Sequence, residues 1–161
     1  MIWQTSSTNS ADTERLGELL GNRLKGGEII ELRSDLGGGK TTFTRGLVRG
    51  TGSNDHVASP TFTLNRVYHA SDLSIYHYDF YRLDDPGILA EQLAESIDDD
   101  RAVVIVEWAD IVEKVLPAER ISVELAQTAN DPDERRIKIH YPPSKRQLIT
   151  ELETQWQVSQ P

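Results

Sequence analysis

The segment Ser34–Thr42, SDLGGGKTT, carries the residue types of a phosphate-binding loop. In the pattern G-x-x-x-x-G-K-[ST], backbone amides surround the phosphates, a lysine reaches the β- and γ-phosphates, and the next hydroxyl holds Mg²⁺. Gly39, Lys40 and Thr41 match the end of this pattern, whereas Ser34 stands where its first glycine would be. That position lies at the exit of a strand, away from most phosphate contacts, so we expect serine to be tolerated there.

Three consecutive glycines precede the lysine and favour an anion site at a helix N-terminus. Glycine lets the backbone approach a phosphate closely and adopt conformations that a Cβ atom would obstruct. The alternative is a glycine-rich turn that starts a helix and binds nothing. The residues of this loop that we expect to bind nucleotide are Leu36, Gly37, Gly38, Gly39, Lys40, Thr41 and Thr42.

Two acidic residues follow apolar or aromatic strand-like runs. Glu107 comes directly after Val103–Val106, and Asp79 ends the run Ser74–Asp79. An acid in such a position can bind Mg²⁺ through water in nucleotide hydrolysis. Either residue could hold the metal while the other polarises the attacking water. The alternative for each is an ordinary surface acid at the end of a strand.

Two further side chains are candidates for the same site. Trp108 follows Glu107 directly, and a tryptophan at the end of a strand serves most often as core packing or as a packing lid. Thr61 could contact the γ-phosphate, although a turn started by Pro60 explains it equally well. The four histidines show no metal-ligand spacing, so we interpret most of them as structural, with His77 on the same strand face as Asp79.

The elements that must position these residues alternate between helices and strands. Apolar periodicity predicts helices, the first with Ser10 or Asp12 as its N-cap, over Asp12–Leu24, Lys40–Val48, 86–97, Ile111–Val115 and Ser144–Trp156. Strands are predicted over Glu28–Leu32, Thr63–His69, Ser74–Phe80, Ala102–Val106, Ile121–Leu125 and Arg136–Tyr141. This order predicts an α/β fold of the three-layer, P-loop NTPase type. Its central sheet would be mostly parallel with an antiparallel hairpin or edge, in one domain over residues 1–161.

The composition narrows the class of protein. The chain has 161 residues, a net charge of −9 and no cysteine, which excludes disulfides and thiolate metal sites. The acidic balance argues against tight binding of nucleic acid by this chain alone. With no signal peptide pattern and no long apolar run, we expect a cytoplasmic protein without a membrane segment.

Four blocks of sequence resemble one family, the TsaE (formerly YjeE) proteins. They stand in the order and spacing of that family: Asp35–Phe43, Ser59–Leu64, His77–Leu83 and Glu107–Trp108. The resemblance covers about residues 10 to 140. It implies a P-loop ATPase, slow without partners, that supports synthesis of N6-threonylcarbamoyladenosine on tRNA together with the TsaB and TsaD proteins. Those partners, rather than this chain, would contact the tRNA.

The resemblance also implies roles for individual residues. ATP and Mg²⁺ would be the cofactors, with Lys40 on the β- and γ-phosphates and Thr41 and Glu107 on the metal. Asp79 would be needed for hydrolysis, and Trp108 would lie near the nucleotide. The residues implied to border the adenine are Ser10, Thr13 and Arg135.

Other nucleotide-dependent functions would need sequence features of their own. A GTPase would need an Asn-Lys-x-Asp motif, which the sequence lacks. A small-molecule kinase would need an acceptor pocket and usually an arginine-rich lid, for which little chain is spare. A nucleotide-gated binding module, in which ATP holds a complex together and turnover is incidental, cannot be separated from an ATPase by sequence.

Overall fold

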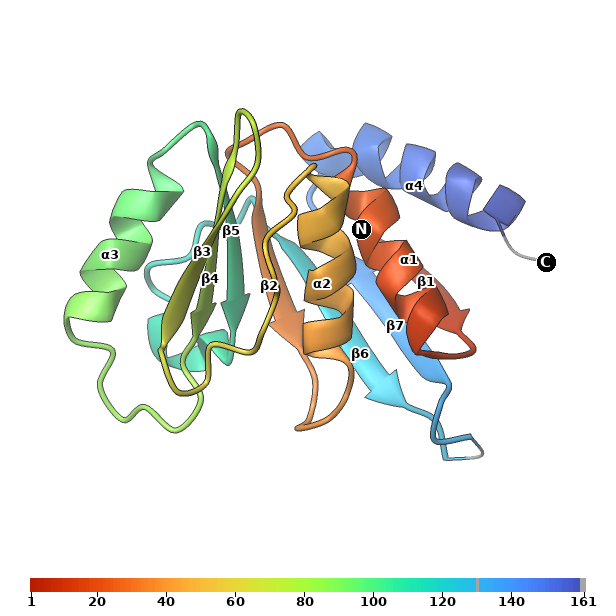
Figure 1. Cartoon of the computed structure of the whole chain (residues 1–161), viewed down its shortest axis with the longest axis horizontal. Coiled ribbons are helices and arrows are strands. Elements are labelled where there is room, and N and C mark those ends of the chain that lie inside the picture. Colours follow the sequence, from red (N-terminus) through yellow and green to blue (C-terminus); the bar gives the residue numbers. More distant parts are fainter. Residues whose placement is uncertain (130, 160–161) are drawn as a thin grey trace.

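A seven-stranded mixed sheet forms the centre of the computed structural model, which describes residues 1–129 and 131–159 (Figure 1). The strands are β1 Ile2–Ser7, β2 Ile29–Arg33, β3 Asn65–His69, β4 Ser74–Asp79, β5 Ala102–Glu107, β6 Ile121–Gln127 and β7 Arg135–His140. Their order across the sheet is β1-β7-β6-β2-β5-β4-β3. The four central strands β6, β2, β5 and β4 pair in parallel, and both edges are antiparallel.

Helices cover the sheet from both sides. They are α1 Ser10–Gly21, α2 Lys40–Gly50, α3 Ile88–Ile97 and α4 Arg146–Ser159, with short 3-10 helices at Ala109–Val112 and Pro143–Lys145. The apolar residues of α1, α2 and α4 share one buried cluster with Ile30 and Ile105, whereas those of α3 share another with Ile29 and Val104. Because alternate strand residues point to opposite faces, these clusters form two cores. The predicted three-layer P-loop NTPase-like fold is therefore confirmed.

Strand β5 is apolar along its length and has its one charged residue at its carboxyl end. All six residues of its sequence AVVIVE are buried, as expected of a parallel strand that helices cover on both faces. Its apolar residues supply both cores, so only its final residue, Glu107, is charged. Strand β4 ends beside it, because Asp79 pairs with Glu107 across the two strands.

Helices α1 and α2 approach each other closely, which fixes the helix that follows the glycine loop. A Cβ atom added to Gly17 would lie 2.2 Å from the carbonyl oxygen of Phe43, and one added to Gly46 would lie 1.8 Å from that of Glu14. Glycine is therefore required on both helices. Arg49 of α2 adds ion pairs to Glu14 and Glu18 of α1.

The structure corrects several predicted boundaries and adds one strand. Residues 2–7 form β1, which the sequence did not predict and which pairs antiparallel with β7. Helix α1 begins earlier than predicted, and its N-cap is Asn9, whose side chain accepts from the amide of Asp12, rather than Ser10 or Asp12. The short helix predicted at Ile111–Val115 is the 3-10 helix Ala109–Val112.

The remaining predicted elements are present with shifts of one to three residues at their ends. The hairpin of β3 and β4 and the antiparallel pair of β6 and β7 are both confirmed. The first strand of the hairpin begins at Asn65 instead of Thr63, and the C-terminal helix extends to Ser159. None of the helices within the described ranges combines the length and apolarity needed to cross a membrane.

Candidate nucleotide-binding site

The glycine loop connects the carboxyl end of β2 to the first residue of α2, at the lower edge of the sheet in Figure 1. Gly37 and Gly39 have φ values of +76° and +108°, which residues with a Cβ rarely adopt. The positions of the loop that adopt left-handed backbone conformations are thus both glycine. Strand, loop and helix meet in the arrangement that binds phosphate in P-loop proteins.

Lys40 is the first residue of α2 and is 7% exposed. Its ammonium group donates to the carbonyl oxygen of Ser34 at 3.0 Å and to that of Asp35 at 3.2 Å. The hydroxyl of Ser34 lies 3.3 Å away, and the ring centroid of Trp108 is 4.9 Å from Nζ. Because every one of these partners is uncharged, the charge on Lys40 stays available to an anion in the cavity.

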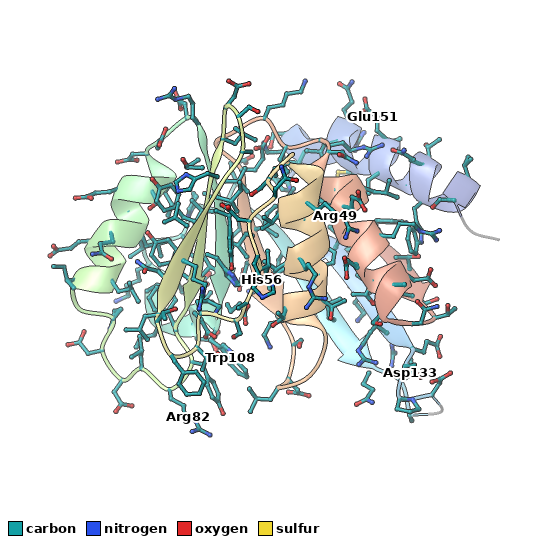
Figure 2. All side chains as sticks on the ribbon, in the orientation of Figure 1. Arg49, His56, Arg82, Trp108, Asp133 and Glu151 are labelled. Atoms are coloured by element: carbon teal, nitrogen blue, oxygen red, sulfur yellow. The ribbon has the colours of Figure 1, made fainter. Side chains whose placement is uncertain are left out.

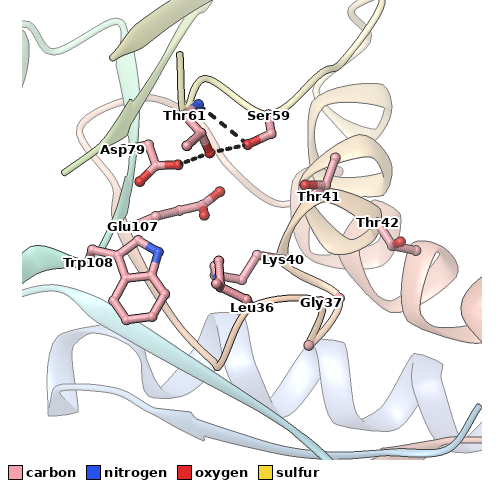
Figure 3. A pocket seen from close by; sticks show the side chains of 12 residues that line it. Leu36, Gly37, Lys40, Thr41, Thr42, Ser59, Thr61, Asp79, Glu107 and Trp108 are labelled. Atoms are coloured by element: carbon pink, nitrogen blue, oxygen red, sulfur yellow. Dashed lines mark hydrogen bonds between the residues drawn. The ribbon is translucent and has the colours of Figure 1, made fainter. Parts of the chain in front are cut away.

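Asp79 and Glu107 lie side by side at the ends of β4 and β5. They are 1% and 3% exposed and are paired in register. Figure 3 shows the Glu107 side chain directed into the cavity between Asp79 and Lys40. Two buried carboxylates next to each other are costly unless cations or hydrogen bonds compensate them. The pair therefore favours a cation in this cavity.

The hydrogen bonds of the two carboxylates differ. Both oxygens of Asp79 are used, since Oδ2 accepts from the hydroxyl of Thr61 at 2.7 Å and Oδ1 accepts from the amide of Tyr81 at 2.9 Å. Glu107 accepts at Oε1 from the ring of His77 at 2.8 Å, and no described residue donates a hydrogen bond to its Oε2. Glu107 thus has a free oxygen for a metal ion, whereas Asp79 is held by the protein.

A cavity of about 230 Å³ brings most of the predicted residues together (Figure 3). It is lined by Leu36, Gly37, Gly38, Gly39, Lys40, Thr41, Thr42, Ser59, Thr61, Asp79, Glu107 and Trp108. Of these, sequence reasoning omitted only Ser59. Its hydroxyl lies 2.8 Å from that of Thr61, which continues the hydrogen-bonded chain to Asp79. The sequence feature that could have indicated Ser59 as a site residue is its position two residues before Thr61 in the same loop.

The three predicted adenine-side residues do not line this cavity. Arg135 donates from Nε to the carbonyl oxygen of Gly38 at 3.0 Å, so it holds the outer side of the glycine loop. A Cβ atom at Gly39 would lie 3.6 Å from Arg135 Nε and 3.9 Å from Thr13 Cγ2, which places both residues beside the loop. Ser10 is exposed at the start of α1.

Strained backbone surrounds the site. Within the described residues, the non-glycine residues with positive φ are Leu64, Arg82 and Trp108. Each lies in or just after a segment that reaches the cavity. Such conformations cost of order 1 to 3 kcal/mol each and persist only where the surrounding structure enforces them. The ring of Trp108 lies 5.0 Å from that of Tyr81, and Figure 2 shows Trp108 and Arg82 together at the lower edge of the sheet.

The donors present fit magnesium rather than a metal held by protein alone. No group of three or more His, Asp or Glu side chains in the described part of the chain could hold a metal ion. Mg²⁺ commonly uses only one or two carboxylates, a hydroxyl, water and phosphate oxygens. Thr41 and Glu107, which line the same cavity, offer that donor set.

Comparisons with known proteins place these features in one family. The sequence model described as "Threonylcarbamoyl adenosine biosynthesis protein TsaE" matches residues 7–137. The chain belongs to the TsaE family. Membership connects it with the biosynthesis of threonylcarbamoyladenosine in tRNA, the process that the family description and the names of its relatives state.

Individual relatives cover most of the chain. It is 37% identical over 136 residues to the tRNA threonylcarbamoyladenosine biosynthesis protein TsaE of Bacillus subtilis, which is 84% of this chain and 82% of that protein. The protein of the same name from Treponema pallidum is 35% identical over 77% of this chain and 91% of its own. The crystal structure of Bacillus subtilis YdiB superposes with a TM-score of 0.78 at 29% identity, over 96% of both chains.

Proposed function

We propose that this chain is a Mg²⁺-dependent ATPase that supports N6-threonylcarbamoyladenosine synthesis on tRNA together with TsaB and TsaD. One observation carries the proposal. The lysine of a phosphate loop and two buried strand-end carboxylates line one cavity, and one of those carboxylates has an oxygen to which no residue in the described part of the chain donates. This is the set of groups that nucleotide hydrolysis requires.

The triphosphate is held by the loop and the helix that follows it. Backbone amides from Gly37 to Thr41 and the N-terminus of α2 surround the β- and γ-phosphates, to which Lys40 adds a positive charge. For this, the ammonium group gives up at least one of its backbone carbonyl partners. Thr13, Ser10 and Arg135 border the adenine, and the first and last of them lie beside Gly39 of the loop.

Thr41 and Glu107 hold the magnesium ion. Bound there, Mg²⁺ would supply neutralisation of charge on the phosphate oxygens, and Oε2 would be the oxygen of Glu107 available to it. Asp79 has both oxygens fixed by Thr61 and Tyr81, so it is suited to orient the attacking water rather than to bind metal. Thr61 links Asp79 to the loop that contacts the γ-phosphate.

The partner proteins, rather than this chain, would bind the tRNA. A net charge of −9 opposes tight contact with a phosphate backbone. TsaB and TsaD would therefore hold the tRNA, and hydrolysis by this chain would reset or support their reaction between turnovers.

Phosphate release tests the proposal when the partners are added one at a time. The full chain should release phosphate from ATP, faster with TsaB and TsaD, and Glu107→Ala should abolish this release. Glu91→Ala on the exposed face of α3 is the matched control and should behave as wild type. A chain that assembles with TsaB and TsaD only when ATP is present, yet releases no phosphate, is instead a nucleotide-gated binding module. Transfer of the γ-phosphate to a small molecule would indicate a kinase.

A further inference from the structure

His77 is a histidine with no exposed surface whose ring contacts the candidate metal ligand. It lies on β4 two residues before Asp79, so both side chains point to the α2 face of the sheet. Its Nε2 atom lies 2.8 Å from Oε1 of Glu107 on β5. An ionised carboxylate can only accept a hydrogen bond, so Nε2 carries the proton and donates it.

The other edge of the same ring packs against Tyr68, whose ring centroid is 6.2 Å from that of His77. The hydroxyl of Tyr68 donates its one proton to the carbonyl oxygen of Ala58 at 3.1 Å, and its oxygen lies 3.5 Å from Nδ1 of His77 without donating to it. Burial raises the pKa of Tyr68, so its hydroxyl stays protonated and keeps donating. The imidazole is thus enclosed between β3 and β5 and has little freedom to rotate.

This arrangement determines which oxygen of Glu107 is available. His77 donates a hydrogen bond to Oε1 of Glu107, and no described residue donates one to Oε2. We propose that His77 is a positioning residue that fixes the Glu107 carboxylate so that Oε2 faces the magnesium ion. The inference rests on the proposed function, because it assigns a supporting residue to the same metal site. Partners of this kind commonly change metal affinity by about 10- to 100-fold when they are removed.

His77 is not itself a metal ligand or a catalytic residue. It is absent from the residues that line the cavity, and its Nε2 is already bonded to Glu107. Its effect therefore passes through the orientation of one carboxylate. Loss of that effect should change the Mg²⁺ requirement and leave the contacts of the triphosphate with the glycine loop intact.

Two amide substitutions separate positioning from packing. In His77→Gln the side-chain amide reaches the place of Nε2 and can still donate to Glu107. In His77→Asn the amide reaches only the place of Nδ1, beside Tyr68, so the bond to Glu107 is lost. Both variants bury one amide at the same position. The probe is mant-labelled AMPPNP, and the measurements are its affinity over a range of Mg²⁺ concentrations, its affinity in EDTA, and thermal unfolding.

His77→Asn should raise the Mg²⁺ concentration for half-maximal binding at least tenfold, in line with the loss of a partner of a metal ligand. His77→Gln should return it toward the wild-type value, and the affinity in EDTA should be the same for all three proteins. If the two variants have equal Mg²⁺ requirements, whatever their unfolding temperatures, the role of His77 is refuted. If wild type binds the probe equally with and without Mg²⁺, the proposed function itself fails.

Tyr68→Phe provides an independent variant that keeps the volume of the side chain. It removes the hydroxyl that lies between Ala58 and His77. The Mg²⁺ requirement should rise in the same direction as in His77→Asn, by a smaller factor, because the bond to Glu107 remains. An unchanged requirement in Tyr68→Phe would contradict the part of the proposal that assigns the second edge of the ring a positioning role.

Discussion

The hydroxyl of Ser34 occupies the space that a side chain at Gly38 would need. A Cβ atom built on Gly38 would lie 2.1 Å from Ser34 Oγ and 2.8 Å from Ser34 Cβ. The residue that replaces the usual first glycine of the loop is therefore accommodated by a glycine four positions later. The space that Ser34 needs is thus available only because residue 38 has no side chain.

The contact predicts energetic coupling between the two positions. Gly38→Ala should weaken ATP binding more in the wild-type chain than in a Ser34→Gly chain, because the collision is absent from the second background. Affinity for mant-ATP in a double-mutant cycle should give a coupling energy on the order of 1 kcal/mol. Some loss should persist in the double variant, since the backbone oxygen of Asp35 lies 3.0 Å from the added Cβ. Additive effects would show that the two residues are independent in solution.

Lys40→Ala should weaken ATP binding by about 10- to 100-fold, because a charge-assisted contact to phosphate worth about 1.5 to 3 kcal/mol is lost. Titration with mant-ATP and Mg²⁺ measures the change. Arg45→Ala, a half-exposed basic residue on the same helix, is the control and should retain wild-type affinity. Equal weakening in both variants would indicate a general effect of helix charge rather than a phosphate contact of Lys40.

Asp79→Asn should stop hydrolysis while ATP affinity stays close to wild type. The amide can still accept from Tyr81, but the neutral group no longer polarises water, and its nitrogen cannot accept the hydroxyl of Thr61. Single-turnover hydrolysis and mant-ATP titration together give the two quantities. Loss of binding without a separate loss of the chemical step would instead place Asp79 on the nucleotide or the metal.

The chemistry-bearing residues could be predicted from sequence because short-range signals mark them. Lys40 belongs to a local motif, and Glu107 follows an apolar run that is typical of a buried strand. His77 and Ser59 could not be assigned, because their contacts depend on the register of β4 against β5 and on the path of the loop before Thr61. These are long-range relationships that local spacing does not encode.

Strand β1 was missed for a different physical reason. Only Trp3 and Ser7 of its six residues are buried, so it shows almost no apolar alternation. Its conformation comes from six paired positions along β7. The N-cap of α1 is Asn9, because its side chain accepts from the amide of Asp12, while Ser10 is already the first residue of the helix.

Nucleotide binding should change the fluorescence of Trp108. Its ring centroid lies 4.9 Å from the Lys40 ammonium group, and movement of this charge toward phosphate would alter the field at the indole. Trp3 and Trp156 are buried in the core beneath α1 and α4, away from the cavity. Addition of ATP and Mg²⁺ should therefore change the emission of wild type but not of Trp108→Phe. A signal that survives this substitution would come from a change elsewhere in the fold.

A buried carboxylate on the face of the sheet away from α2 makes the stability of the fold depend on pH. Glu31 of β2 is 2% exposed and accepts from Nε of Arg33 at 2.6 Å and from Nε of Arg120 at 2.7 Å. Burial alone would raise the pKa of Glu31, but the hydrogen bonds from the two arginines outweigh it, so the pKa is lowered. The carboxylate therefore stabilises the fold above its unfolded pKa of about 4.3, and this contribution is lost as pH falls through the folded value.

Arg120→Leu should consequently cost about 3 kcal/mol in free energy of unfolding at pH 7, because among the described residues it leaves the buried carboxylate paired with the half-exposed Arg33 alone. The difference from wild type should narrow below about pH 4, where protonation of Glu31 removes the charge that Arg120 stabilises. Urea unfolding at several pH values measures both effects. Adding Glu31→Leu to Arg120→Leu should recover most of the loss, since no buried charge then remains unpaired. A loss that is constant with pH would mean that Arg120 acts through packing or through its bonds to Glu113 and Pro117 instead.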